Sequence, residues 1–102
     1  MAQAELVFHP EASAEYIESY GWYAAHDPRA ADRFEQEVES AVQRIVQDPH
    51  RWPRYDEKHR KLLLRRFPYL MIYREHGDRI WIVAVAHGHR TPGYWKKRTV
   101  SR

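Results

Sequence analysis

The chain has 102 residues and no cysteine, which fits a single domain and excludes both disulfides and thiolate metal sites. The first 50 residues carry three Arg and ten Asp or Glu, a net charge of −7, whereas the rest carry 14 Lys or Arg and four Asp or Glu, a net charge of +10. This asymmetry favours a basic surface for phosphate or an acidic partner over a merely solvated surface. The longest apolar run, residues 80–86, is too short for a membrane span, and no signal peptide precedes Pro10, so a cytoplasmic protein is expected.

A short N-terminal strand and an amphipathic helix are predicted first. Residues 4–8 are apolar around Glu5 and are expected to form an edge strand. Pro10 suits the first turn of a helix, where its missing N–H would be unpaired anyway. Trp22 lies off the apolar face of this helix and is either incidental or a partner contact. The residues that recur at helical spacing and define the predicted buried face are Ala12, Tyr16, Ile17, Tyr20, Tyr23 and Ala24.

A second helix is predicted to begin at Pro28, with Asp27 as its N-cap, and to end before Asp48. Its length of ~20 residues corresponds to roughly 30 Å. Its apolar face comprises Ala31, Phe34, Val38, Ala41, Val42 and Ile45. Because the connection between the two helices is short, they are expected to form an antiparallel hairpin that covers one face of a sheet.

The segment 49–60 is predicted to be a loop because it contains two prolines and no periodicity. Loops of about 12 residues without secondary structure are uncommon and often functional. Basic residues alternate here with Trp52 and Tyr55, a pattern that suits either nucleic-acid bases and phosphates or an acidic peptide. The basic residues of the loop are Arg51, Arg54, Lys58 and Arg60.

Three strands, at 61–66, 69–75 and 79–87, are predicted to form an antiparallel meander, with a tight turn at Gly77. The third strand is apolar on both faces, which is typical of a central strand covered on both sides. Regular alternation places Ile80, Ile82, Ala84 and Ala86 on one face and Trp81, Val83 and Val85 on the other. The predicted fold class is therefore α+β.

The polar cluster His87-Gly88-His89-Arg90 at the end of this strand leaves several chemistries open. His87 and His89 alternate and are able to bind a metal with His59 or His76, but no ligand spacing supports such a site, and no metal ligand is assigned. A histidine or Tyr94 suits proton transfer in RNA cleavage, with Arg90 stabilising the charged phosphate. A purely structural role for His87 and Arg90 is the remaining alternative.

The segments RRFPYLMIYR, IWIVAVAHGHR and PGYW, with a glycine-containing turn between the first two, resemble the RelE/ParE family of bacterial toxins. The resemblance covers the helical hairpin, the loop and the meander, hence nearly all of the single domain 1–102. It implies an N-terminal strand and a helical hairpin packed on a small antiparallel sheet. It also implies a cytoplasmic growth inhibitor, held in a hetero-oligomer by an antitoxin whose C-terminal segment wraps the toxin. No cofactor is expected.

The family divides by target. RelE-like members cut messenger RNA on the ribosome and use an arginine after the last strand, which Arg90 matches, together with basic strand residues and a C-terminal tyrosine. Leu70 stands where these nucleases carry an arginine, and Tyr94 lies closer to Arg90 than the nuclease spacing. ParE-like members instead bind and poison DNA gyrase. The two departures favour a ParE-like toxin, with the ribosome-dependent nuclease as the alternative and a non-toxic nucleic-acid-binding module as a third hypothesis.

These hypotheses assign residues to three roles. The expected target-binding residues are Trp52, Arg54, Arg90, Tyr94, Trp95, Lys96, Lys97 and Arg98. The expected antitoxin-binding residues are Tyr20, Trp22, Arg65 and Arg66. If the chain is a nuclease, the expected catalytic residues are Arg90, His87, His89 and Tyr94.

Overall fold

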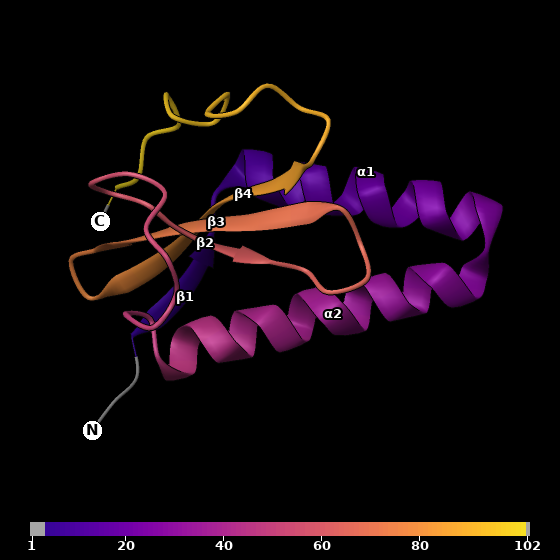
Figure 1. Cartoon of the computed structure of the whole chain (residues 1–102), viewed down its shortest axis with the longest axis horizontal. Coiled ribbons are helices and arrows are strands. Elements are labelled where there is room, and N and C mark those ends of the chain that lie inside the picture. The colour runs from indigo at the N-terminus through magenta and orange to yellow at the C-terminus, as the bar shows by residue number, and fades with distance from the viewer. Residues whose placement is uncertain (1–3, 102) are drawn as a thin grey trace.

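Two helices pack on a four-stranded sheet within residues 4–101, the part of the chain that the computed structural model describes (Figure 1). The elements in chain order are β1 (Glu5–Phe8), α1 (Pro10–His26), α2 (Pro28–Gln47), β2 (Arg60–Leu63), β3 (Tyr69–His76) and β4 (Arg79–His87). The strand order across the sheet is β1-β4-β3-β2. In the described residues neither helix has the length and apolar character that crossing a membrane requires.

The α+β fold class is confirmed, with one correction to the sheet. Strands β2, β3 and β4 form the predicted antiparallel meander, and β4 lies centrally between β1 and β3. Strand β1, however, pairs with β4 in parallel, from Glu5 opposite Arg79 to Phe8 opposite Ile82. The sheet is therefore mixed. Two helices and the strands β2 and β3 separate β1 from β4 in sequence, and β4 then runs beside β1 in the same direction.

Both helices begin where proline and a capping side chain predict. The Asp27 carboxylate accepts a hydrogen bond from the Arg29 N–H at 3.0 Å, and Nδ1 of His9 accepts one from the Glu11 N–H at 3.1 Å. The predicted buried face of α1 is wrong at Ile17, which is 67% exposed. The contact face of α1 is a narrow stripe through Ala12 and the three tyrosines, and Ile17 projects one step around the helix from it.

The sheet is covered on both faces. The helices cover one face around Phe34 and Ile45, and the opposite face is closed by Tyr55 of the loop and by Trp95 of the tail, which we define as residues 91–101. Figure 1 shows α2 and the yellow tail on opposite sides of the sheet. Because neither face of β4 meets solvent, its nearly continuous apolar sequence is explained.

A β-bulge overturns the predicted alternation along β4. Tyr73 pairs with Ile82 but Ile72 pairs with Ala84, so Val83 is an extra residue on β4. One inserted residue reverses the direction of every later side chain. As a result Val85 joins Ile82 on the helix-covered face, and Ala84 and Ala86 face the tail.

The first strand of the meander is shorter than predicted, at Arg60–Leu63 rather than 61–66. The N–H groups of Arg65 and Arg66 point away from the sheet and donate to Glu37 of α2, at 3.0 and 3.1 Å. These N–H groups therefore satisfy their hydrogen bonds on a helix side chain instead of on a strand.

The structure predicts that burial in β4 determines stability. Ile82 is fully buried, so Ile82→Ala is expected to lower the free energy of unfolding by roughly 2–5 kcal/mol through lost contacts and a cavity. The matched control is Ile17→Ala on the exposed side of α1, which should change stability little. Urea denaturation of both variants tests this, and equal shifts of the two midpoints would contradict the assigned core.

Candidate functional site

The tail is anchored on the sheet by a buried tryptophan. Trp95 is only 2% exposed, and its ring packs edge-on against Tyr55 and His59, with centroid distances of 4.9 and 4.6 Å. His59 is itself buried, and its Nδ1 lies 2.9 Å from the Asp56 carboxylate. The loop 49–59 and the tail therefore form one aromatic layer over this face of the sheet.

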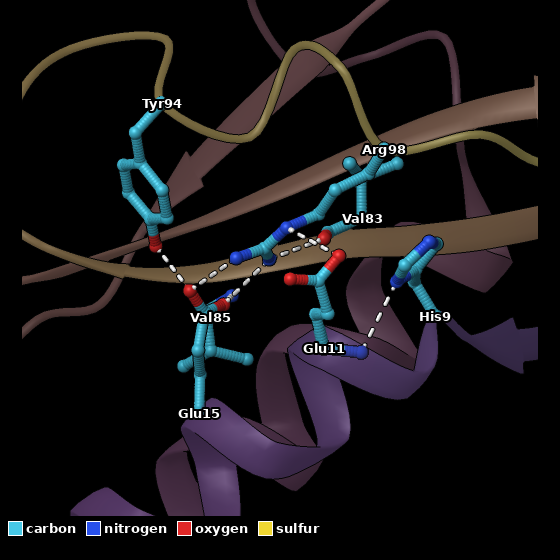
Figure 2. A network of polar contacts seen from close by, with 7 residues as sticks. All are labelled: His9, Glu11, Glu15, Val83, Val85, Tyr94 and Arg98. Atoms are coloured by element: carbon cyan, nitrogen blue, oxygen red, sulfur yellow. Dashed lines mark hydrogen bonds and ion pairs between the residues drawn. The ribbon is translucent and has the colours of Figure 1, made fainter.

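A second anchor joins the tail to α1 (Figure 2). The Arg98 guanidinium donates to both carboxylate oxygens of Glu15, at 3.0 and 2.8 Å, and also to the Val83 carbonyl at 3.0 Å. The Tyr94 hydroxyl donates to the same carboxylate, as does the Val85 N–H at 2.9 Å. The Glu15 and Arg98 side chains are only 14% and 10% exposed. We call these contacts the Glu15 network.

The Glu15 network lies where β4 loses its neighbouring strand. The last backbone hydrogen bond between the β1 segment and β4 is donated by the His9 N–H to the Ile82 carbonyl, at 2.9 Å. The chain then turns into α1. The Val83 carbonyl and the Val85 N–H beyond this point need partners, because unpaired buried backbone groups are costly. Arg98 supplies the donor and Glu15 the acceptor, so side chains take the place of strand pairing.

The same contacts determine the ionisation of the three side chains. Burial by itself raises the pKa of Glu15, but hydrogen bonds from Arg98, Tyr94 and the Val85 N–H, together with the Arg98 charge, outweigh it and lower the pKa below its ordinary value. Burial, followed by the hydrogen bond to Glu15, raises the pKa of Tyr94. The hydrogen bond to Glu15 raises the pKa of Arg98. At neutral pH the network therefore contains an ion pair and a neutral phenol.

A cleft of about 580 Å³ opens beside the network, between α1 and the end of β4. The Arg90 guanidinium lies 3.9 Å from the centre of the Tyr94 ring, which forms one wall. The residues that line the cleft are Glu15, Glu18, Ser19, Trp22, Tyr23, Tyr69, Val85, His87, Arg90 and Tyr94. The cleft thus combines several aromatic side chains with charged groups of both signs, and it suits a protein segment with an apolar anchor better than a highly charged small molecule.

The residues proposed as a nuclease set do meet at this cleft. His87, Arg90 and Tyr94 line it, and the His89 ring stacks on His87 at 4.9 Å. The His89 N–H donates to Nδ1 of His87 at 3.0 Å, and the His87 ring also packs edge-on against Tyr69. Within residues 4–101 no three His, Asp or Glu side chains lie close enough together to hold a metal ion.

Comparison with known proteins identifies the family. The model of the ParE toxin of type II toxin-antitoxin systems, parDE, matches residues 6–92. The chain belongs to the ParE toxin family. It is 31% identical over 88 residues to Toxin ParE2 of Mycobacterium tuberculosis, in strains CDC 1551 and H37Rv, across 85% of this chain and 84% of the relative.

The fold of this ParE-family toxin is also that of a solved relative. The structure described as the chromosomal ParDE TA system from P. aeruginosa superposes with a TM-score of 0.72 at 22% identity, over 83% of this chain and 96% of that chain. The family match ends at Pro92, so Tyr94 and Arg98 lie beyond it. The Glu15 network therefore joins a helix within the matched residues to two tail residues that follow them.

The expected target-binding residues of the toxin separate into exposed and buried groups. Lys96, Lys97 and Arg54 are exposed. Trp95 is buried, and Arg98 is half-buried with most of its side chain covered. Both hold the tail in place, so their burial does not support a direct contact with a target. Trp52 is half-buried, and its indole N–H donates to the Arg44 carbonyl at 3.3 Å.

The expected antitoxin-binding residues do not form one surface. Trp22 is 58% exposed and lines the cleft, whereas Tyr20 packs half-buried on the core. Arg65 and Arg66 are exposed on a different depression beside α2. These assignments stay predictions, now divided between two regions.

Sequence reasoning missed Glu15, the residue that connects the site. Its signal was present: Glu15 directly precedes Tyr16 on the predicted apolar face of α1, next to positions that pack on the core. A carboxylate at the border of a buried helix face needs a cationic or N–H partner, because its burial is otherwise costly. Its partner, Arg98, lies 83 residues away in sequence and could not be predicted from a local pattern.

The Glu15 network predicts a pH-dependent stability. Since the pKa of Glu15 is lower in the folded chain than in the unfolded chain, its ionised form stabilises the fold above about pH 4.3, and this contribution is lost as the pH falls through the folded value. Glu15→Gln is expected to cost about 1.5–3 kcal/mol at pH 7. In acid, where Glu15 is protonated, the free energies of unfolding of the variant and the parent should converge.

Urea denaturation at neutral and acidic pH measures this difference. The control is Glu18→Gln, an exposed neighbour on the same helix and the same cleft. A Glu18→Gln loss as large as that of Glu15→Gln, or a Glu15→Gln loss that is constant with pH, would contradict the assigned network.

Proposed function

We propose that this ParE-family toxin arrests bacterial growth by binding and poisoning DNA gyrase in the cytoplasm. We further propose that a cognate antitoxin neutralises it in a hetero-oligomeric complex. Family membership over residues 6–92 supports the toxin assignment. The choice of a binding mechanism rests on the state of Tyr94.

The observation that carries the proposal is the engagement of Tyr94 by Glu15. A general acid or base works best with a pKa near the operating pH. The Tyr94 hydroxyl instead donates to a carboxylate, and burial and this bond raise its pKa above the ordinary value of a tyrosine. The Arg90 guanidinium also packs over the Tyr94 ring, 3.9 Å from its centre. Tyr94 therefore serves as a support for Arg90, a role that suits recognition more than proton transfer.

The cleft supports the proposed antitoxin complex. Its exposed Trp22 and its tyrosines are the residue types that dominate binding energy at protein interfaces. An antitoxin segment that fills the cleft would cover Arg90 and the base of the tail at the same time. Such a segment would thereby block any target that uses the same surface, which accounts for neutralisation without a change of fold.

Induced expression of the chain in bacteria is expected to stop growth, and purified protein is expected to reduce supercoiling by gyrase. Arg90→Ala and the exposed pair Lys96→Gln with Lys97→Gln should lose most of this inhibition, because hot-spot contacts are often worth about 2 kcal/mol or more each. His87→Ala and His89→Ala should stay inhibitory. Growth arrest in cells and a plasmid supercoiling assay measure both, with soluble expression verified for every variant.

A ribosome-dependent endoribonuclease is the second candidate, favoured by the meeting of His87, His89 and Arg90 beside one cleft. Removal of a proton-transfer group costs about 10²–10⁴-fold in rate. Cleavage of ribosome-bound message by the purified protein, abolished in the histidine variants, would transfer the assignment to this enzyme. Unimpaired growth at high soluble expression would count against both candidates.

A further inference from the structure

The position of the Arg90 side chain depends on one neighbouring ring. Arg90 follows the end of β4 in an exposed segment, residues 88–92, where its backbone N–H donates to the His87 carbonyl at 3.0 Å. Its guanidinium carbon lies 3.9 Å from the centre of the Tyr94 ring. No carboxylate within residues 4–101 forms an ion pair with Arg90. The Tyr94 ring is therefore the support that determines where this exposed charge lies.

The Tyr94 ring is itself held at its hydroxyl end by Glu15 (Figure 2). The hydroxyl donates to Oε2 of the Glu15 carboxylate, which also accepts a hydrogen bond from Nη2 of Arg98 at 2.8 Å. Oε1 of the same carboxylate accepts hydrogen bonds from Nη1 of Arg98 at 3.0 Å and from the Val85 N–H at 2.9 Å. The ring is thus connected to α1, to β4 and to the rest of the tail through one carboxylate.

Glu15 also neutralises a second arginine that lies near this ring. The Arg98 guanidinium carbon is 5.1 Å from the centre of the Tyr94 ring, so the ring has two guanidinium groups beside it. Like charges that share a ring repel each other, and the two-pronged ion pair with Glu15 cancels the charge of Arg98. The Arg90 charge is the one that stays available at the cleft.

Glu15 is too well covered to be a main contact of a binding partner. Its side chain is only 14% exposed, and its two oxygens accept four hydrogen bonds from within the chain. A partner in the cleft therefore meets the exposed Arg90 and the Tyr94 ring first. An effect of Glu15 on binding has to pass through the side chains that it holds.

We propose that Glu15 is a positioning residue of the toxin, which through Tyr94 fixes Arg90 in the orientation that the target recognises. The inference rests on the proposed function, because it names what orients a residue of the same target surface. Ordering one long side chain at an interface weakens affinity roughly two- to tenfold. Glu15 removes this cost for Arg90 in advance, and so contributes to potency without being the contact itself.

The informative variant is Glu15→Gln, which keeps the size of the side chain but replaces one oxygen with an NH2 group. Since each oxygen accepts two hydrogen bonds, either orientation of the amide leaves two donors facing another donor. Arg98 loses its ion pair with this side chain at the same time. The Tyr94 ring and Arg90 are then no longer fixed, although neither residue has been replaced.

Potency is measured as the induced level of protein that stops bacterial growth and as the concentration of purified protein that halves supercoiling by gyrase. Glu15→Gln is expected to require about tenfold more protein. The matched control is Val38→Ala, which lowers stability through lost volume in the core on α2, away from the network. Its potency should equal that of the parent, with both variants verified as folded at the assay temperature. Unchanged potency of folded Glu15→Gln, or equal losses in both variants, would overturn the proposal.

A double-mutant cycle separates positioning from a general structural role. Glu15→Gln is expected to weaken binding to immobilised gyrase about tenfold in the parent but only about twofold in the Arg90→Ala background, because the residue that it positions is then absent. Equal factors in the two backgrounds would overturn the assignment. If Glu15→Gln does not fold, Arg98→Gln breaks the same ion pair from the side of the tail and is judged by the same factors.

The Nε–H signal of Arg90 in a proton–nitrogen correlation spectrum provides a readout that needs no target. The ring current of Tyr94 shifts this signal while the guanidinium lies over the ring, so the shift should disappear in Glu15→Gln and persist in Val38→Ala. A shift that persists in Glu15→Gln would overturn the positioning role. Growth arrest without inhibition of gyrase would instead contradict the proposed target, and the growth comparison would then decide the role of Glu15.

Discussion

The Glu15 carboxylate at the free edge of β4 is the contact on which the arrangement of the tail and the cleft depends. Strand β1 covers only the first residues of β4, and the chain then leaves the sheet to form α1. Glu15, placed on α1 beside this gap, accepts from the Val85 N–H and fixes Arg98, which in turn donates to the Val83 carbonyl. One side chain thus connects a helix, the central strand and the tail.

The charge asymmetry of the sequence has a structural counterpart in such contacts. The acidic first half supplies helices and β1, and the basic second half supplies the meander and the tail. The two halves meet in the Glu15–Arg98 pair and in the Glu5–Arg79 pair, at 2.8 and 2.7 Å. Glu37 adds a third meeting point through the backbone of Arg65 and Arg66. The exposed positive charge outside these contacts includes the Arg65 and Arg66 side chains beside α2 and the tail lysines Lys96 and Lys97.

The features that were predicted correctly are those determined by near neighbours in sequence. Asp27 and Pro28 mark a helix boundary because capping is local, and Gly77, at φ 64°, marks the hairpin turn because only glycine adopts this conformation easily. The nearly continuous apolar sequence of β4 correctly predicted a strand that is covered on both faces. The resemblance in the meander motifs then led to the correct family.

The features that were missed depend on contacts between distant segments. The parallel pairing of β1 with β4 is set by the crossover, and the bulge at Val83 changes which face Val85 occupies without any glycine or proline to announce it. Glu15 bonds to residues 70 to 83 positions later, so no local pattern names its partners. The exposed Ile17 shows the converse limit, because periodicity defines a face but not how much of that face is covered.

The tail illustrates how packing determines which residues are available for recognition. Trp95 and Arg98 are three positions apart and both point inward, one into the aromatic layer and the other toward Glu15. The turn between Gly93 and Lys96 is closed by a backbone hydrogen bond of 3.0 Å, and Gly93 adopts φ 77°. Lys96 and Lys97 are therefore held outward by two anchors that flank them. Side chains fixed in this way lose less conformational freedom on association. Under the proposed function, Trp95 and Arg98 therefore support target binding indirectly, because they hold Lys96 and Lys97 in place.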